Sequence, residues 1–296
     1  MPGIGIGIGI NNRRVIGKPA APSGLSASFT VDTISGDLTW TDNSGGKAQY
    51  EIHSSTNSGA YTLLATTFAG STSYSDTSCK QNASVIYRIR AKIGGLYSDY
   101  VTATALVTPL CWKTNQSTLN TVTIATLNIV AGYSVVVNWG DGTSNTYSGN
   151  NSTITKNYTS TGTYNISVSG DTDKIGTLTH NGGVTSYENL SKFMIPDNIT
   201  TWRMYNTPFT GTPSLWVFPS SLVSLFIYGC SFTGSAPKIS EGTGGLVYRA
   251  YSNSFSSTNT TIFRKGLVEY DIKNQNVIFP TVEVDKFLKQ QQIGIR

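Results

Sequence analysis

The chain has 296 residues, which is room for two or three domains of ordinary size. Only 12% of the residues are charged, against about a quarter in typical soluble proteins. The formal net charge of +5 is scattered along the sequence, so the composition lacks the dense basic stripe that nucleic-acid binding requires. No apolar run is long enough for a membrane-spanning helix.

Serine, threonine, asparagine, glycine and tyrosine take the place of the missing charges, which is typical of many short strands with uncharged outer faces. The three cysteines, Cys79, Cys111 and Cys230, lie far apart in different segments. An odd number without paired spacing argues against a disulfide framework, so we expect synthesis in a reducing cytoplasm.

The first 21 residues are predicted to be an anchor strand followed by a linker. Ile4, Ile6, Ile8 and Ile10 alternate with glycine, so a strand here would have an isoleucine face and a bare backbone face. Such a strand holds its shape only against a partner. The predicted partner-anchoring residues are Ile4, Ile6, Ile8, Ile10, Arg13 and Arg14. The alternative is a mobile tail, which four exposed isoleucines disfavour.

The order of these residues also argues against a secretion signal, because the arginines follow the apolar part instead of preceding it.

Residues 22–108 are predicted to contain seven short strands separated by glycine- and serine-rich turns, at 25–31, 37–42, 48–55, 61–67, 72–76, 84–92 and 100–106. The segment resembles a fibronectin type III domain, in Pro22, Leu25, Trp40, Tyr50-Glu51-Ile52, Thr72-Ser73-Tyr74 and Tyr87-Arg88-Ile89-Arg90-Ala91. The resemblance implies a β-sandwich that serves as a spacer or an adhesive module.

Residues 109–171 are predicted to form a second β module with strands at 121–129, 133–140 and 164–170. The Asp-Gly pair in Trp139-Gly140-Asp141-Gly142-Thr143 is a strong hairpin signal. We interpret Asp141 as a turn-forming residue rather than a catalytic or metal-binding one. Together with Tyr158, Gly162, Tyr164, Ile166 and Val168, this segment resembles polycystic-kidney-disease (PKD) domains, which are also β-sandwiches.

Residues 172–296 contain a repeat, because Phe209, Phe232 and Phe255 lie 23 residues apart. The windows 199–209, 222–232, 245–255 and 267–277 fit the template L-x-x-L-x-L-x-x-N/C-x-L and resemble irregular leucine-rich repeats. Thr207 departs from the template at its Asn/Cys position, whereas Cys230 is predicted to fill that position in the core. Residues 282–292 are predicted to form a short helix that caps the stack.

The predicted fold class is therefore mainly β: two sandwiches, then a short solenoid with a small C-terminal helix. His53 and His180 fall in different modules, and no pair of carboxylates or nucleophile set is visible. We expect no catalytic residues, no cofactor, no metal and no enzyme activity, although calcium binding by Asp171 and Asp173 is left open.

The opening Met-Pro-Gly-Ile-Gly-Ile-Gly-Ile-Gly-Ile resembles the N-termini of virion proteins in crAss-like bacteriophages. The resemblance implies a head fibre or decoration protein of the virion, made in the host cytoplasm. Its partners would be other capsid or tail proteins, bound through the N-terminus, and host surface glycans or proteins. A homo-oligomer, with a trimer as the leading state, is expected. The alternatives are a phage tail fibre or tail adaptor, a bacterial surface adhesin, and a carbohydrate-active enzyme, which lacks a catalytic pair.

Overall fold

The computed structural model describes residues 17–119, 121–180, 193–207, 209–213, 216–239, 246–250, 253–257 and 267–271. The predicted anchor residues and the predicted helix at 282–292 lie outside these ranges. The described chain is mainly β, as predicted, and Thr172–Lys174 form a short 3-10 helix, η1. Within the same ranges, no helix has the length and apolarity needed to cross a membrane.

The first module is a sandwich of two antiparallel sheets. Its strands are β1 (Ser23–Thr30), β2 (Ser35–Thr41), β3 (Gln49–Thr56), β4 (Thr62–Thr66), β5 (Ser73–Asp76), β6 (Ser84–Ile93), β7 (Leu96–Tyr97), β8 (Val101–Thr102) and β9 (Leu106–Val107). One sheet has the order β1-β2-β5 and the other the order β4-β3-β6-β7, with β8 and β9 also paired to β6. Alternate residues of β3 and β6 point inward, and Trp40 packs edge-on against Tyr50 in the core.

The last predicted strand of this module is broken. Residues 100–106 form only the two short pairings of β8 and β9 with β6. Between them Ala103 is buried, and its N–H donates to the carbonyl of Tyr87. Ser98, just before this segment, uses its hydroxyl to accept from the N–H of Ala91. The hydroxyl of Ser98 thus accepts a backbone N–H at the place where a continuous strand would supply a carbonyl.

The second sandwich consists of two sheets that pack face to face around a core that includes Trp112 and Trp139. Its strands are β10 (Leu110–Gln116), β11 (Thr121–Ile129), β12 (Ser134–Asn138), β13 (Ser144–Ser148), β14 (Ser152–Asn157) and β15 (Gly162–Gly170). One sheet has the order β10-β15-β12-β13. The predicted hairpin is confirmed, since β12 and β13 pair antiparallel on either side of the Asp-Gly turn, from Asn138 opposite Ser144.

The other sheet continues out of the sandwich. It has seven strands in the order β14-β11-β16-β17-β20-β23-β25, and β16 (Ile175–His180) is the strand at which the pairing changes. It is antiparallel to β11 and parallel to β17 (Thr201–Arg203). The buried residues on both sides of β16 belong to one hydrophobic cluster. The predicted boundary at residues 171 and 172 therefore divides the sequence but not the core.

Beyond β16 the chain winds in successive coils, and strands of one coil pair in parallel with strands of the next. These are β17, β18 (Thr210–Gly211), β19 (Val217–Phe218), β20 (Ser224–Phe226), β21 (Ser231–Ser235), β22 (Lys238–Ile239), β23 (Leu246–Arg249), β24 (Ser254–Ser257) and β25 (Leu267–Asp271). Backbone pairing aligns Trp202, Leu225, Tyr248 and Tyr270 in one row, at spacings of 23, 23 and 22 residues. Shorter parallel sheets, β18-β21-β24 and β19-β22, form other sides of the coil.

A polar contact repeats with the same period inside the coil. Thr207, Cys230 and Asn253 are 23 residues apart and are all buried. The thiol of Cys230 lies 3.4 Å from the carbonyl oxygen of Met204, and the amide of Asn253 donates to the carbonyl of Ile227, which is the equivalent position one coil later. Cys230 and Asn253 therefore each satisfy a carbonyl of the preceding coil, which explains the small polar residue in the template.

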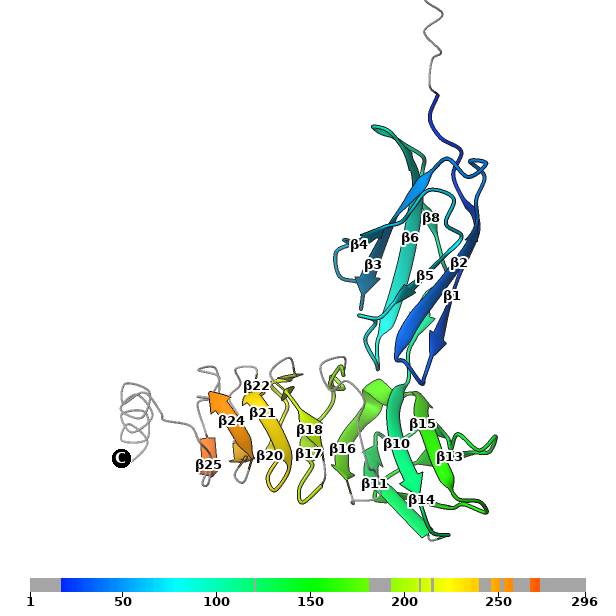
Figure 1. The fold of residues 1–296 in the computed structure, drawn as a ribbon. Coiled ribbons are helices and arrows are strands. Elements are labelled where there is room, and N and C mark those ends of the chain that lie inside the picture. Colours follow the sequence, from blue (N-terminus) through cyan, green and yellow to red (C-terminus); the bar gives the residue numbers. More distant parts are fainter. Residues whose placement is uncertain are drawn as a thin grey trace, which may run out of the picture.

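The three parts are joined in an L-shaped arrangement (Figure 1). The first sandwich stands on the second, and the coils lead away from the second sandwich to one side. The backbone of Gln81 bridges to Phe193, and the amide of Asn82 donates to the carbonyl of Met194 over 2.9 Å. On another side of the same junction, the amide of Asn165 donates to the carboxylate of Asp32 over 3.0 Å. Contacts at two places fix the first sandwich against the rest.

Candidate functional site

The outward face of the parallel sheet presents aromatic and guanidinium side chains. Along β17, β20 and β23, residues alternate between the core and the surface, so every second side chain is outward and half-buried. We call the outward set Arg203, Tyr205, Phe226, Tyr228 and Arg249 the outer strip.

Within the outer strip the side chains form two rows across the strands. Arg203 and Arg249 lie opposite Phe226 on either side in the parallel register. Their guanidinium carbons are 5.1 and 5.0 Å from the centroid of the Phe226 ring. In the next row the rings of Tyr205 and Tyr228 are stacked, with 5.3 Å between centroids and 14° between planes. The strip is thus a row of stacked rings flanked by cationic donors.

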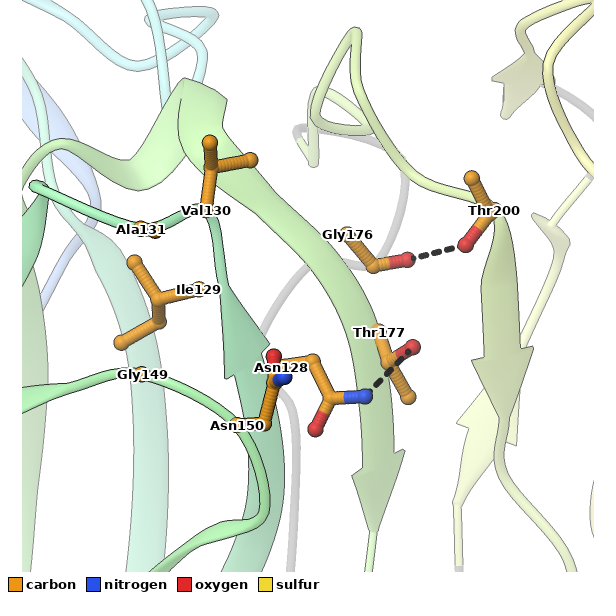
Figure 2. Close-up of a pocket in the computed structure, with 9 residues that line it drawn as sticks. All are labelled: Asn128, Ile129, Val130, Ala131, Gly149, Asn150, Gly176, Thr177 and Thr200. Atoms are coloured by element: carbon orange, nitrogen blue, oxygen red, sulfur yellow. Dashed lines mark hydrogen bonds between the residues drawn. The ribbon is translucent and has the colours of Figure 1, made fainter.

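A shallow cavity lies next to this sheet, where the second sandwich meets the first coil (Figure 2). Its volume is about 250 Å³, and its lining residues are Asn128, Ile129, Val130, Ala131, Gly149, Asn150, Gly176, Thr177 and Thr200. None of these nine residues has an ionisable side chain, so the cavity offers hydrogen bonds but no acid–base chemistry.

Three polar side chains of the cavity, Asn128, Thr177 and Thr200, already form hydrogen bonds within the protein. The amide of Asn128 donates to the hydroxyl of Thr177 over 3.4 Å, and its oxygen accepts from the N–H of Asn151 over 2.7 Å. The hydroxyl of Thr200 donates to the carbonyl of Gly176 over 2.9 Å. A ligand would have to displace these bonds, so the outer strip is the stronger candidate site.

Asp141 occupies the turn for which the sequence predicts it. Its carboxylate accepts from both the N–H and the hydroxyl of Thr143, at 3.0 and 2.6 Å, and pairs with Lys156 at 2.8 Å. Burial acts to raise the pKa of Asp141, but the bonds from Lys156 and Thr143 outweigh it and hold the pKa at about 2. These contacts are those of a turn-stabilising carboxylate.

The other acidic and histidine residues singled out by the sequence are not brought together. The carboxylate of Asp171 accepts from the N–H of Ser134 over 3.0 Å, and Asp173 pairs with Lys174. His53 lies on the first sandwich, whereas His180 is buried at the end of β16. Within the described ranges, no group of three or more His, Cys, Asp and Glu residues is arranged to hold a metal ion.

The cysteines have structural positions. All three lie in the described part of the chain, are buried and form no disulfide. Burial raises the pKa of the Cys111 thiol to about 12, so it is protonated at neutral pH and is a poor nucleophile.

The outer strip was not predicted from the sequence, although a signal for it was present. The repeat was recognised from its buried positions and not from the variable positions between them. Those variable positions also recur every 23 residues, as Arg203, Phe226 and Arg249 in one row and as Tyr205 and Tyr228 in the next. Aromatic and arginine residues repeated at outward positions indicate a surface selected for contact.

The predicted partner-anchoring residues, Ile4, Ile6, Ile8, Ile10, Arg13 and Arg14, lie outside the described residues.

Comparison with known proteins gives matches among solved structures. No family model matches the chain, and no curated protein does. Among solved structures, the chain is similar to a fibronectin-type-III (Fn3)-like protein from Clostridium thermocellum, with 30% identity over 32% of this chain and 97% of that one and a TM-score of 0.27. A pectate lyase from Pectobacterium carotovorum matches with 11% identity over 86% of this chain and 63% of that one, and a TM-score of 0.23.

The first of these matches spans about a third of the chain, and its TM-score is too low for an argument about fold or function. The second is too distant to bear on fold or activity.

Proposed function

We propose that this chain is a structural protein of a bacteriophage virion, a head fibre or decoration protein, which displays β modules for weak binding to host surfaces. Its N-terminal strand, with the isoleucines at positions 4, 6, 8 and 10, would dock into another virion protein. In this proposal residues 109–171 are a PKD-like sandwich and the coils are an irregular leucine-rich repeat. The function is binding without catalysis.

The observation that carries the binding part of the proposal is the outer strip. Stacked rings such as Tyr205 and Tyr228 offer an apolar surface to the C–H groups of a sugar, and the guanidinium groups in the neighbouring row can donate to its hydroxyl oxygens. The backbone pairing of the coils holds these side chains in rows, so little ordering is needed on binding. We therefore propose a host surface glycan as the ligand of the strip.

One such site would bind weakly, because a shallow platform buries little of a ligand. Several copies facing outward on one particle would raise the overall avidity without new contacts. We propose that the chain forms a closed homo-oligomer, a trimer, with the N-terminal strands gathered at the attachment point. Mass photometry of the isolated full-length protein tests this, and a monomer at micromolar concentration contradicts it.

The binding experiment compares the full-length protein with a double variant, Tyr205→Ala/Tyr228→Ala, on an array of bacterial surface glycans. The variant should lose about tenfold or more in affinity, because each stacked ring contributes about 1 kcal/mol. The matched control is Tyr133→Ala, a tyrosine of the second sandwich that is 41% exposed. Equal binding by all three proteins would exclude the strip as the glycan site.

The location in the virion is tested by the protein composition of purified particles, with gold-labelled antibody to place the chain on the head or the tail. Labelling of heads supports the head-fibre assignment, and labelling of tails would replace it with a tail fibre or adaptor. Detection on bacterial cells but not on particles would identify a surface adhesin instead.

A further inference from the structure

The first sandwich carries a second, separate array of rings and cations. It lies on the outer face of the β4-β3-β6-β7 sheet and at its β8 edge, away from the core. Rings and cations alternate along it in the order Tyr61, Arg88, Tyr100, Arg90, Tyr97 and Lys92. We call these six residues the tyrosine–cation ladder.

The two guanidinium groups are enclosed by rings. The guanidinium carbon of Arg88 lies 3.9 Å from the ring centroid of Tyr61 and 4.1 Å from that of Tyr100. That of Arg90 lies 4.0 Å from the Tyr97 centroid and 4.8 Å from the Tyr100 centroid. Rings on both flat faces leave only the edge of a guanidinium, where its N–H donors point, for a further partner.

The ladder has more positive than negative charge. Glu51 is the carboxylate that pairs with it, accepting from Arg90 at 2.7 Å and from Lys92 at 3.1 Å. Burial acts to raise the pKa of Glu51, but the bonds from Arg90 and Lys92 outweigh it, so the group is ionised at neutral pH. Three cations against one carboxylate leave two positive charges in excess.

The neighbouring ionisable groups do not cancel this excess. Lys18 and Asp99 form a pair of their own at 2.5 Å. His53 lies opposite Arg88 on the adjacent strand, and its ring is 5.4 Å from that of Tyr100. Burial, and then the charge of Arg88, lower the pKa of His53, so its imidazole is neutral at pH 7.

Two nitrogen atoms of this face also lack partners. The Nε of Arg88 and the Nδ1 of His53 are both buried, and neither has a hydrogen-bond partner among the described residues. Arg88 likewise has no carboxylate partner within the same part of the chain. An arginine that is stacked, held in place and unpaired is preorganised for an anion from outside.

We propose that the tyrosine–cation ladder binds an acidic polysaccharide, through sulfate or carboxylate groups on successive sugars. Arg88, Arg90 and Lys92 follow one another at every second position of β6, about 6.7 Å apart along a straight line. A linear polyanion places its charges along such a line. The half-buried tyrosine edges between the cations contact the sugar rings that separate those charges.

The site goes beyond the proposed function and does not depend on it. The ladder lies on the first sandwich and the outer strip lies on the coils, and they share no residue. Virion location and strip binding can each fail without affecting the ladder.

The test measures binding of the full-length protein to dextran sulfate and to neutral dextran of the same length, which differ only in charge. Dextran sulfate should bind, neutral dextran should not, and added salt should weaken binding. Arg88→Gln should weaken binding about tenfold. Arg88→Lys should weaken it about fivefold, because it keeps the charge but loses the planar fork.

The matched control is Lys47→Gln, which removes one positive charge from an exposed position of the same sandwich. It should bind as the unchanged protein does. Equal losses in Lys47→Gln and Arg88→Gln, or full binding by Arg88→Lys, would overturn the ladder as the site, since net charge alone would then explain the result.

Two further polyanions test the assignment to a saccharide. Binding of polyglutamate or single-stranded DNA as tightly as dextran sulfate would overturn it, whereas binding at least tenfold weaker supports it. If Arg88→Gln does not fold, Lys92→Gln at the other end of the ladder replaces it, with an expected loss of about threefold. Unchanged binding by that variant counts against the proposal.

Discussion

The imidazole of His180 meets the indole of Trp112 edge to face, with 5.6 Å between ring centroids and 84° between ring planes. Phe209 packs against the same imidazole at 5.5 Å and Trp202 at 6.3 Å. Trp112 belongs to the second sandwich, whereas Phe209 and Trp202 belong to the first coil. His180 therefore lies in an aromatic cage at the place where the two parts share a core.

The first prediction concerns acid. Burial lowers the pKa of His180 from about 6.5 to about 3, although a hydrogen bond with the backbone of Ile124 acts in the opposite direction. Between these two values the unfolded chain holds a proton on this residue and the folded protein does not. Protonation of His180 therefore does not affect the free energy of unfolding above about pH 6.5. As the pH falls from there toward 3, the unfolded chain gains the proton and the free energy of unfolding decreases, by an amount on the order of a few kcal/mol.

Chemical denaturation at a series of pH values measures this loss. His180→Gln, which cannot titrate, should flatten the dependence of the unfolding free energy on pH in that window. Its stability at neutral pH will be lower, so the slope and not the absolute value is compared. An unchanged slope would assign the acid sensitivity to carboxylates such as Asp141.

The second prediction concerns the stacked phenylalanines of the coils. The rings of Phe232 and Phe255 are parallel within 9°, with 6.4 Å between centroids, and Phe209, Phe232 and Phe255 are all buried, as their spacing predicts. Phe232→Ala should lower the unfolding free energy by about 3–5 kcal/mol, because the lost ring leaves an apolar cavity that water does not fill. The matched control is Phe68→Ala, whose ring is 88% exposed and whose loss should cost less than about 1 kcal/mol. Similar losses at both positions would refute the buried stack.

The third prediction separates backbone strain from crowding in the Trp139–Thr143 turn. Gly140 and Gly142 both have positive φ, at 76° and 86°. A Cβ on Gly140 would lie 2.6 Å from the carbonyl oxygen of Asn165, whereas one on Gly142 would meet nothing within 4 Å. Gly142→Ala should cost about 1 kcal/mol, the strain alone, and Gly140→Ala about 3 kcal/mol, strain plus clash. Thermal unfolding measures both, and equal costs would show that the turn moves away from Asn165.

The fourth prediction concerns the N-terminal strand. Deleting residues 1–12 should leave a folded, soluble protein, because the two hydrophobic clusters of the described residues are built from Leu25 onward. The truncated protein should no longer be incorporated into particles when it replaces the full-length chain. Circular dichroism checks the fold and particle composition checks incorporation. Normal incorporation would exclude the anchor role of Ile4, Ile6, Ile8 and Ile10.

Many local features of the fold could be predicted from the sequence, because they depend on neighbouring residues. The alternation in residues 84–92 places Val85, Tyr87 and Ile89 inside, and the Asp-Gly pair at 141–142 forms the hairpin turn. These features were predictable because a strand has a period of two and a turn requires particular backbone angles, which neighbouring residues alone decide.

The same alternation also places Arg88, Arg90 and Lys92 on the outer face of that strand, so half of the tyrosine–cation ladder could be found from the sequence. Its other half could not. Tyr61, Tyr97 and Tyr100 come from the segments before β4, in β7 and before β8, and only strand pairing brings them beside β6.

The sequence alone determined the mainly-β class, the inward residues of a strand such as β6, and the 23-residue period with Phe209, Phe232 and Phe255 buried. Only the tertiary structure decided that β16 pairs with β11 on one side and with β17 on the other, which merges the second sandwich and the coils into one core. The physical reason is that side-chain pattern fixes which face of a strand is buried, whereas its partner depends on hydrogen bonds and packing between segments far apart in the chain. His180 shows the difference, since its surroundings at the end of β16 exist only once both partners are in place.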